Sequence, residues 1–174
     1  MRRLITAAAI ACAVPLHGVA AQAPSGFKAE FLGNFSQIEN KFYQLADAMS
    51  AKYDWRPGAG VRSVCEVFMH IAVDNYMLGG AFGVAMPAGM SGPDAEKCAG
   101  DKAKVTAVMK ASFDAIKARV SAMSDADLDA KYTLFGANQT RRAWLLATAE
   151  HAGEHLGQSI AYARMNGVVP PWSK

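Results

Sequence analysis

The sequence predicts an all-α fold, a four-helix bundle with a long loop between the second and third helices. Four segments repeat apolar residues at three- and four-residue steps, the period of one helical face. No segment sustains the alternation of apolar and polar residues that marks a half-buried strand. A chain of 174 residues is also long enough for one bundle with a buried core.

The first predicted helix covers residues 25–50. Its apolar side chains recur at steps of three, four and seven residues, so they fall on one stripe of the helix. The members of this stripe are Phe27, Phe31, Ile38, Phe42, Leu45 and Met49. Pro57, Gly58 and Gly60 then interrupt the pattern, which indicates a turn before the second helix.

The second predicted helix covers residues 61–83, and a long loop follows it over residues 84–100. One side of this helix carries Val64, Phe68, Ile71, Ala72, Asn75 and Leu78. Gly79, Gly80 and Gly83 weaken its end. Prolines and further glycines exclude a regular helix in the loop, and loops of this length in compact domains often carry function.

The third predicted helix covers residues 101–123, and the fourth covers residues 139–166. Asp101 is a suitable cap for the third helix. The apolar stripe of that helix is Val105, Val108, Met109, Ser112, Ile116 and Val120. Gly167 ends the fourth helix, because the prolines that follow forbid its continuation. The segment 124–138 between these helices is polar and turn-like.

An export signal is expected over residues 1–21, which leaves residues 22–174 as one domain. Arg2 and Arg3 precede a short apolar run and then small residues up to Ala21, the order found in secretory signal peptides. The apolar run is too short to anchor the chain in a bilayer. The expected location of the protein is therefore the periplasm or the extracellular space.

The charge balance gives no case for nucleic acid as a partner. The leader carries two arginines and no acidic residue, so its removal lowers the formal net charge from +3 to +1. Without a run of Lys or Arg, the chain lacks the basic patch that phosphate binding needs. No later stretch is apolar for long enough to cross a membrane, so we expect no membrane anchor after removal of the signal.

Export also changes how the cysteines are interpreted. Cys12 would leave with the signal, whereas Cys65 and Cys98 would remain. In an oxidising compartment these two can form a disulfide. They can equally be separate thiols, with Cys65 buried in a helix, because the sequence does not supply the Cα separation that a disulfide requires.

Three histidines form a candidate metal site. His70 lies on the buried side of the second predicted helix, and His151 and His155 lie four residues apart on the fourth. Residues at this spacing share a helix face, so their imidazoles can bind one ion, which a third from a facing helix completes. Three protein ligands leave coordination positions open, as in catalytic sites. The alternative is that they are core or surface histidines without a metal.

Three imidazoles do not identify the metal. Zinc or nickel is expected first, and iron or manganese is also accepted by such ligands. The run from His151 to His155 fits the H-x-x-E-H pattern of a zinc protease, with Glu154 as general base. That mechanism needs a further acidic ligand downstream, and no acidic residue follows His155. We therefore reject the protease.

Two carboxylates near the histidines are the candidates for a catalytic role. Asp74 lies one turn after His70, where it can orient the imidazole, join the metal or face water. Glu154 directly precedes His155 and is expected to be solvated or to support a ligand. Residues that can line the pocket, or serve only in packing, are Trp55, Arg56, Asn75 and Tyr162.

The two ends of the domain resemble the DinB/YfiT family of proposed metalloenzymes, and the likeness covers residues 27–172. The first matching stretch holds Trp55-Arg56-Pro57, Gly60-Val61-Arg62-Ser63-Val64, His70-Ile71-Ala72 and Asn75-Tyr76. The second holds His151-x-x-Glu154-His155-x-Gly157-Gln158 and Tyr162-x-Arg164-Met165-Asn166-Gly167-Val168-Val169-Pro170-Pro171. The two ends are fairly specific in order and spacing, while the middle is generic.

The resemblance implies a four-helix bundle with a long crossover, a nickel or zinc site with three histidines, and frequently a homodimer. The family's ligands fall on His70, His151 and His155, which the helix positions also select. Some relatives are thiol-dependent isomerases or S-transferases, and others are called metal-dependent hydrolases. Most are cytoplasmic, so an export signal departs from the family and puts thiol-dependent chemistry in doubt.

These observations lead to three hypotheses about function. The first is an exported metal-dependent enzyme that hydrolyses, or transfers a group of, an unknown small molecule. The second is a non-catalytic periplasmic protein that binds a metal or a small ligand. The third is a helical interaction module without a metal, which predicts no gain in thermal stability on addition of zinc or nickel.

Overall fold

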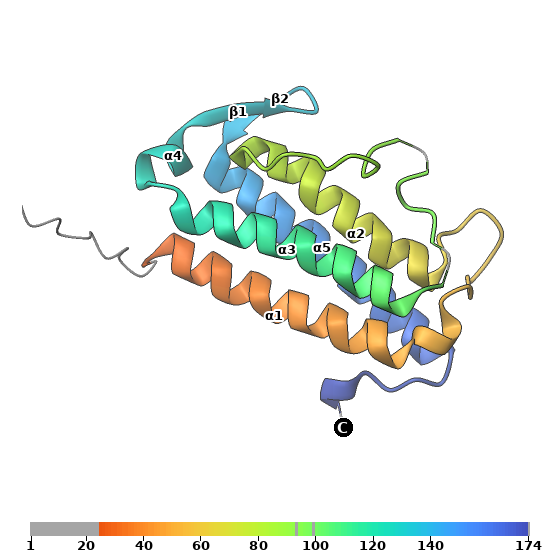
Figure 1. Cartoon of the computed structure of the whole chain (residues 1–174). Coiled ribbons are helices and arrows are strands. Elements are labelled where there is room, and N and C mark those ends of the chain that lie inside the picture. Colours follow the sequence, from red (N-terminus) through yellow and green to blue (C-terminus); the bar gives the residue numbers. More distant parts are fainter. Residues whose placement is uncertain (1–24, 93, 99, 174) are drawn as a thin grey trace, which may run out of the picture.

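Four long helices form the body of the protein in the computed structural model, which describes residues 25–92, 94–98 and 100–173 (Figure 1). They are α1 (Phe27–Ala48), α2 (Val64–Gly79), α3 (Lys102–Ala122) and α5 (Arg141–Met165). Short 3₁₀ helices cover Ser50–Lys52, Gly80–Phe82 and Pro171–Ser173. The predicted all-α bundle is confirmed. The leader predicted over residues 1–21 lies outside the described residues.

The four long helices form two pairs that run in opposite directions (Figure 1). α1 and α5 run one way, and α2 and α3 run the other way. α2 packs against α3 and α5, while α1 packs against the same two helices, so α1 and α2 lie diagonally across the bundle. Because α2 and α3 are parallel, the chain between them must return along the whole length of α2. The predicted long loop is this crossover.

Phenylalanines from three helices fill the centre of the bundle. Phe42 on α1, Phe68 on α2 and Phe113 on α3 are completely buried. The ring centroid of Phe42 lies 6.3 Å from that of Phe68 and 6.1 Å from that of Phe113. Burial of one such side chain contributes about 1.5–3 kcal/mol. This aromatic cluster therefore joins α2 to α3 and, across the centre of the bundle, to α1.

Side-chain caps set the helix boundaries more narrowly than periodicity does. The Ser63 hydroxyl accepts a hydrogen bond from the backbone N–H of Glu66, whose carboxylate accepts one from the backbone N–H of Ser63. This capping box starts α2 at Val64, three residues later than the periodicity predicted. Thr140 caps α5 through the N–H of Ala143, so that helix starts at Arg141.

The segment between α3 and α5, which we predicted to be polar and turn-like, contains regular structure. α4 covers Asp125–Asp129, and strands β1 (Lys131–Leu134) and β2 (Ala137–Thr140) pair in an antiparallel hairpin. The expectation of a segment without strands is therefore wrong. Each strand has four residues, too few for alternation to stand out. Phe135-Gly136 also replaces the Asn-Gly pair that usually marks such a turn.

A disulfide joins Cys65, in the first turn of α2, to Cys98 in the crossover. Their Cα atoms lie 5.9 Å apart, within the range that a disulfide needs. The bridge holds the last part of the crossover against the start of α2. Of the two alternatives that the sequence left open, the structure contains the disulfide.

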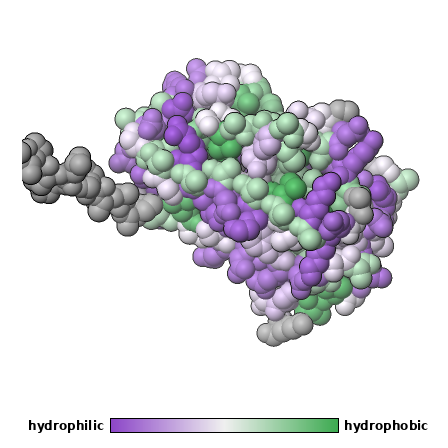
Figure 2. Space-filling view, in the orientation of Figure 1, coloured by the Kyte–Doolittle hydropathy of each residue, from purple (hydrophilic) through white to green (hydrophobic). Residues whose placement is uncertain are grey.

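Hydrophilic and hydrophobic residues are mixed over the face shown in Figure 2. Long hydrophilic side chains lie between smaller apolar patches on this face. Within the described part of the chain, no helix combines the length and the apolar character that a membrane span requires. Among the large apolar residues that the structure describes, Phe135 at the tip of the hairpin is the most exposed, with 65% of its surface accessible.

We expect a Cys65→Ala/Cys98→Ala variant to have a lower free energy of unfolding than the parent. The bridge joins residues 33 positions apart, and loop-closure entropy predicts a loss of about 3–4 kcal/mol for this span. Urea denaturation followed by circular dichroism measures the difference. The parent under reducing conditions should match the variant, and equal stability of the oxidised and reduced parent would contradict the prediction.

Candidate metal centre

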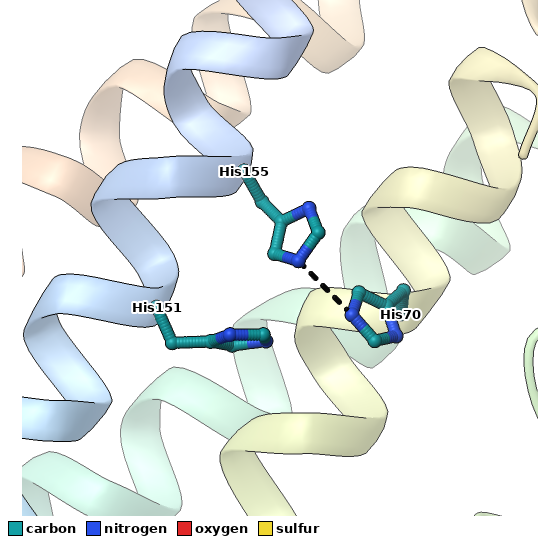
Figure 3. Close-up of side chains that lie close together, drawn as sticks. All are labelled: His70, His151 and His155. Atoms are coloured by element: carbon teal, nitrogen blue, oxygen red, sulfur yellow. Dashed lines mark hydrogen bonds between the residues drawn. The ribbon is translucent and has the colours of Figure 1, made fainter.

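α2 and α5 bring three histidine rings together (Figure 3). His70 comes from the middle of α2, and His151 and His155 come from successive turns of α5. The ring centroids lie 5.4 Å apart for His70 and His151, 4.5 Å for His70 and His155, and 4.6 Å for His151 and His155. One ligand nitrogen of each ring lies within 4.8 Å of the other two. The predicted convergence of these residues is confirmed.

Asp74 lies inside this cluster rather than facing water. It is one turn after His70 on α2 and is buried. Its Oδ2 atom lies 2.6 Å from Nε2 of His151 and 3.1 Å from Nε2 of His70. A carboxylate oxygen therefore joins the imidazole nitrogens at the point where the two helices meet.

Glu96, from the crossover, holds the outer nitrogen of His70. Its Oε1 atom lies 2.7 Å from Nδ1 of His70, and its carboxylate accepts two hydrogen bonds from Arg62, at 2.6 and 3.1 Å. Burial alone would raise the pKa of Glu96, but the hydrogen bonds from Arg62 and His70 lower it below its ordinary value. Glu96 is then ionised at neutral pH and only accepts hydrogen bonds. Nδ1 of His70 must therefore carry the proton.

A second chain of hydrogen bonds holds the outer nitrogen of His155. Oε1 of Gln158 lies 2.7 Å from Nδ1 of His155, and Nε2 of Gln158 donates to the hydroxyl of Tyr162 at 3.0 Å. That hydroxyl donates its own proton to the backbone carbonyl of Arg62 at 3.3 Å. Because the Tyr162 hydroxyl donates its proton to Arg62, it can only accept from Gln158. The Gln158 amide nitrogen therefore faces Tyr162, and its oxygen faces His155. Nδ1 of His155 therefore also carries the proton.

These two assignments direct the Nε2 atoms of the two rings at each other. Nε2 of His70 and Nε2 of His155 lie 3.1 Å apart, and when both rings are neutral each of these atoms presents a lone pair. Two lone pairs at that separation repel unless a positive charge lies between them. Two nitrogens bound to one zinc-like ion at about 2.0–2.1 Å are separated by roughly 3.0–3.4 Å. The observed distance is within that range.

His151 supplies a further indication of the same kind. Its Nε2 atom is buried and has no hydrogen-bond partner among the described residues, although Oδ2 of Asp74 lies only 2.6 Å away. The contact has the distance of an ion pair without the geometry of a hydrogen bond. Buried polar atoms are rarely left unpaired in proteins. A cation bound to Nε2 of His151 and Oδ2 of Asp74 would give both atoms a partner. The donor set therefore fits a divalent metal.

The protonation behaviour of His155 also suits a metal ligand. Burial lowers its pKa, and the neighbouring His70 and His151 lower it further, against the opposite effect of the hydrogen bond to Gln158. A lowered pKa keeps the imidazole neutral at physiological pH. The neutral ring is the form that binds metals.

The other residues singled out in the sequence lie around this cluster. The carboxylate of Glu154 is 68% exposed and lies 3.9 Å from Nδ1 of His151, on the outer side of that ring. Trp55 packs edge-on against Tyr162, with ring centroids 5.3 Å apart. Arg56 pairs with Glu66 at the surface. Glu154, Trp55 and Arg56 therefore have their contacts outside the group of inner nitrogens.

Asn75 does not line the site. Its side-chain amide donates to the hydroxyl of Ser112 at 3.1 Å, in the buried interface between α2 and α3. Asn75 is one residue beyond Asp74, and this step turns its side chain by about 100° around the helix, toward α3. Of its two expected roles, packing is the one that the structure contains.

Sequence reasoning missed three residues that support the histidines: Arg62, Glu96 and Gln158. Gln158 was within reach, because it lies three residues after His155 and shares its helix face. Glu96 lies 26 positions after His70, in a loop of glycines and prolines, and no local pattern connects the two. The one hint that this part of the loop returns to α2 was Cys98, two residues after Glu96, because a disulfide with Cys65 was one of the two alternatives.

Two open pockets adjoin the cluster, toward opposite ends of α2. Toward the end of α2, a pocket of about 280 Å³ has Asp74 and His151 in its wall, and otherwise Met77, Leu78, Phe135, Trp144 and Ala147. Toward the start of α2, a pocket of about 280 Å³ is lined by Arg56, Gly60, Val61, Arg62, Glu66, Glu96 and Lys97. The histidines therefore lie between an apolar pocket and a charged one.

Comparison with known proteins supports the fold described above. The family model of the DinB superfamily matches residues 34–159, a range that includes all three histidines. The fold is similar to a DinB-like protein from Bacillus cereus, with a TM-score of 0.71, 16% identity, and coverage of 82% of this chain and 95% of that chain. It is also similar to a DinB-like protein from Bacillus subtilis, with a TM-score of 0.62, 21% identity, and coverage of 79% and 92%. No curated protein sequence matches the chain.

We expect Gln158→Leu to weaken zinc binding about 10- to 100-fold, because His155 loses the acceptor that fixes its orientation and its protonation. Competition with a chromophoric chelator measures the dissociation constant. Gln37→Leu, at an exposed position of α1, is the matched control and should bind zinc like the parent. Equal affinity in Gln158→Leu and the parent would show that the hydrogen bond to His155 has no part in metal binding.

Proposed function

This chain belongs to the DinB superfamily, and we propose that it is a metal-dependent enzyme of the hydrolase or group-transfer type. The proposed ligands of a single divalent transition metal are His70, His151 and His155. One observation carries the proposal: the inner nitrogens of His70 and His155 face each other at 3.1 Å, with their outer nitrogens held by Glu96 and Gln158.

The donor set supports zinc or nickel first, with iron or manganese as further candidates. Imidazole nitrogens suit all of these ions, and availability rather than affinity usually decides which one is bound. Asp74 adds a hard carboxylate oxygen next to the nitrogens, which widens the choice toward iron and manganese. We therefore assign the site to a divalent transition metal and leave its identity to measurement.

A divalent ion held by these residues supplies Lewis acidity. The chain itself supplies the groups that position the ligands and move protons. Asp74 is the stronger candidate for the catalytic carboxylate, because it is buried and its Oδ2 lies beside two ligand nitrogens. Glu154 is the weaker candidate. Its exposed carboxylate is better placed to orient His151 than to reach a substrate.

A specific observation favours the alternative, a protein that holds a metal or small ligand without catalysis. If Asp74 binds the ion together with three histidines, four protein ligands close a tetrahedral site, which is typical of structural zinc. The same four ligands leave positions open on an ion that accepts five or six. The two functions therefore differ in whether an external ligand can reach the ion.

We also propose that the protein is exported. The order of charged, apolar and small residues over positions 1–21 supports this. A disulfide between Cys65 and Cys98 is consistent with an oxidising compartment. The homodimer implied by the family resemblance stays a prediction, which light scattering on the purified protein can test.

Elemental analysis of natively purified protein tests the metal site. We expect roughly one transition metal ion per chain in the parent and near loss in His70→Ala and His151→Ala, because two remaining imidazoles hold such ions poorly. Addition of zinc at 100 times its dissociation constant should stabilise the metal-free parent by about 2.7 kcal/mol. Neither variant should show this stabilisation.

Glu150→Gln, on the exposed surface of α5 next to His151, is the matched control and should retain the metal. A parent protein that holds no metal and gains no stability from zinc or nickel would overturn the proposed function. It would favour the helical interaction module instead.

A cobalt-substituted protein separates the enzyme from the metal-holding alternative. We expect its visible spectrum to change when azide is added, because an open coordination position accepts the anion. The Asp74→Asn variant should retain cobalt and respond to azide as well. A parent spectrum that azide leaves unchanged, together with a response in Asp74→Asn, would identify a site that Asp74 closes and would favour the non-catalytic alternative.

A further inference from the structure

The apolar pocket beside the histidines has a composition that selects its ligand. Five apolar side chains form most of its wall, from the end of α2, from α5 and from the hairpin. None of its described lining residues is Lys or Arg, so a charged group in its depth would have no cationic partner. Asp74 and His151 form the remaining wall, which places the candidate metal ligands at one side of an apolar space.

His151 is the more exposed of the two cluster residues that line the apolar pocket. Its side chain is 27% exposed, against 10% for His70 and 8% for Asp74. A molecule that enters from the apolar pocket meets His151 and Asp74 first, because these two residues form its polar wall.

Phe135 contributes to this pocket from an unfavourable backbone position. Its φ is 51° and that of Gly136 is 78°, so both residues of the two-residue loop have positive φ. This is the pattern of a type I′ turn, which prefers Asn-Gly because bulky side chains disfavour positive φ. Burial does not offset this cost, because 65% of the Phe135 side chain is exposed. Its ring contacts Trp144 edge-on, with centroids 6.4 Å apart.

We propose that the apolar pocket binds the apolar part of the substrate, with Phe135 as a specificity-determining residue. The substrate class is a small neutral molecule that carries one aryl or branched alkyl group next to a carbonyl or similar metal-binding oxygen group. The pocket lies just below the usual volume range of ligand sites, roughly 300–1,000 Å³, so the apolar group is about the size of a phenyl ring. This inference rests on the proposed function, because the oxygen group is assigned to the metal.

Trp144 is a poor residue for testing this inference, because its indole N–H donates to the backbone carbonyl of Tyr132 at 3.0 Å and so anchors the hairpin. Phe135→Asn removes the aromatic wall and introduces a residue that tolerates positive φ. Ala147→Phe fills the pocket from α5. The matched control is Leu146→Asn, which removes a side chain that is 56% exposed on the same helix and does not line the pocket.

Two hydroxamates serve as probes of the zinc-loaded protein: acetohydroxamate and benzohydroxamate. They share the metal-binding group and differ in a methyl or a phenyl group. Isothermal titration should give at least about tenfold tighter binding of benzohydroxamate to the parent and to Leu146→Asn, because the phenyl group is buried in the pocket. This ratio should fall about fivefold in Phe135→Asn and disappear in Ala147→Phe, while acetohydroxamate binds equally to all four proteins.

The Phe135→Asn variant should also have a melting temperature equal to or higher than that of the parent, because Asn tolerates positive φ. If Phe135 served only to stabilise the hairpin, its replacement would lower the melting temperature. A phenyl preference that both pocket variants retain would overturn the assignment of the pocket, and acetohydroxamate binding would show that the metal site stands. Failure of both probes to bind, in protein that takes up no zinc, would overturn the proposed function and this inference with it.

Discussion

The hydrogen bonds at the outer nitrogens of His70 and His155 determine what their inner nitrogens can do. Glu96 and Gln158 each accept a hydrogen bond from Nδ1–H, so the two Nε2 atoms are directed at each other, 3.1 Å apart. The antiparallel packing of α2 and α5 positions the two rings, but packing alone would leave their protonation open. Arg62 links both supports, since its guanidinium binds Glu96 and its backbone carbonyl accepts from Tyr162. Metal binding, on this account, depends on the residues around the ligands as much as on the ligands.

The crossover between α2 and α3 connects the topology of the bundle to this site. Because the two helices are parallel, the chain returns along α2. It places Glu96 against His70 and then forms the disulfide through Cys98, two residues later, with Cys65 in the first turn of α2. A connection that the fold requires for topological reasons therefore also completes the site, and the covalent bond restrains the segment that carries Glu96.

The site is asymmetric along α2. Toward the start of that helix lie charged side chains, among them Arg62 and Glu96, and Glu96 holds His70 in place. Toward its end, apolar side chains surround a space that opens beside His151. Phe135 belongs to the second region, where its backbone conformation is one that aromatic residues rarely adopt. Such local strain is often retained where a side chain serves ligand binding rather than stability.

The four long helices and the candidate site of three histidines could be predicted from the sequence, because helical periodicity and the spacing of His151 and His155 are local properties. It did not predict the hairpin, whose four-residue strands and Phe-Gly turn lack the usual signals. Three other features could be seen only in the folded structure. Glu96 contacts His70, Cys65 and Cys98 form a disulfide, and Asp74 lies inside the cluster. Each of these contacts joins segments whose distance depends on the direction in which the helices pack and on the path of the crossover, and neither is encoded in a local pattern.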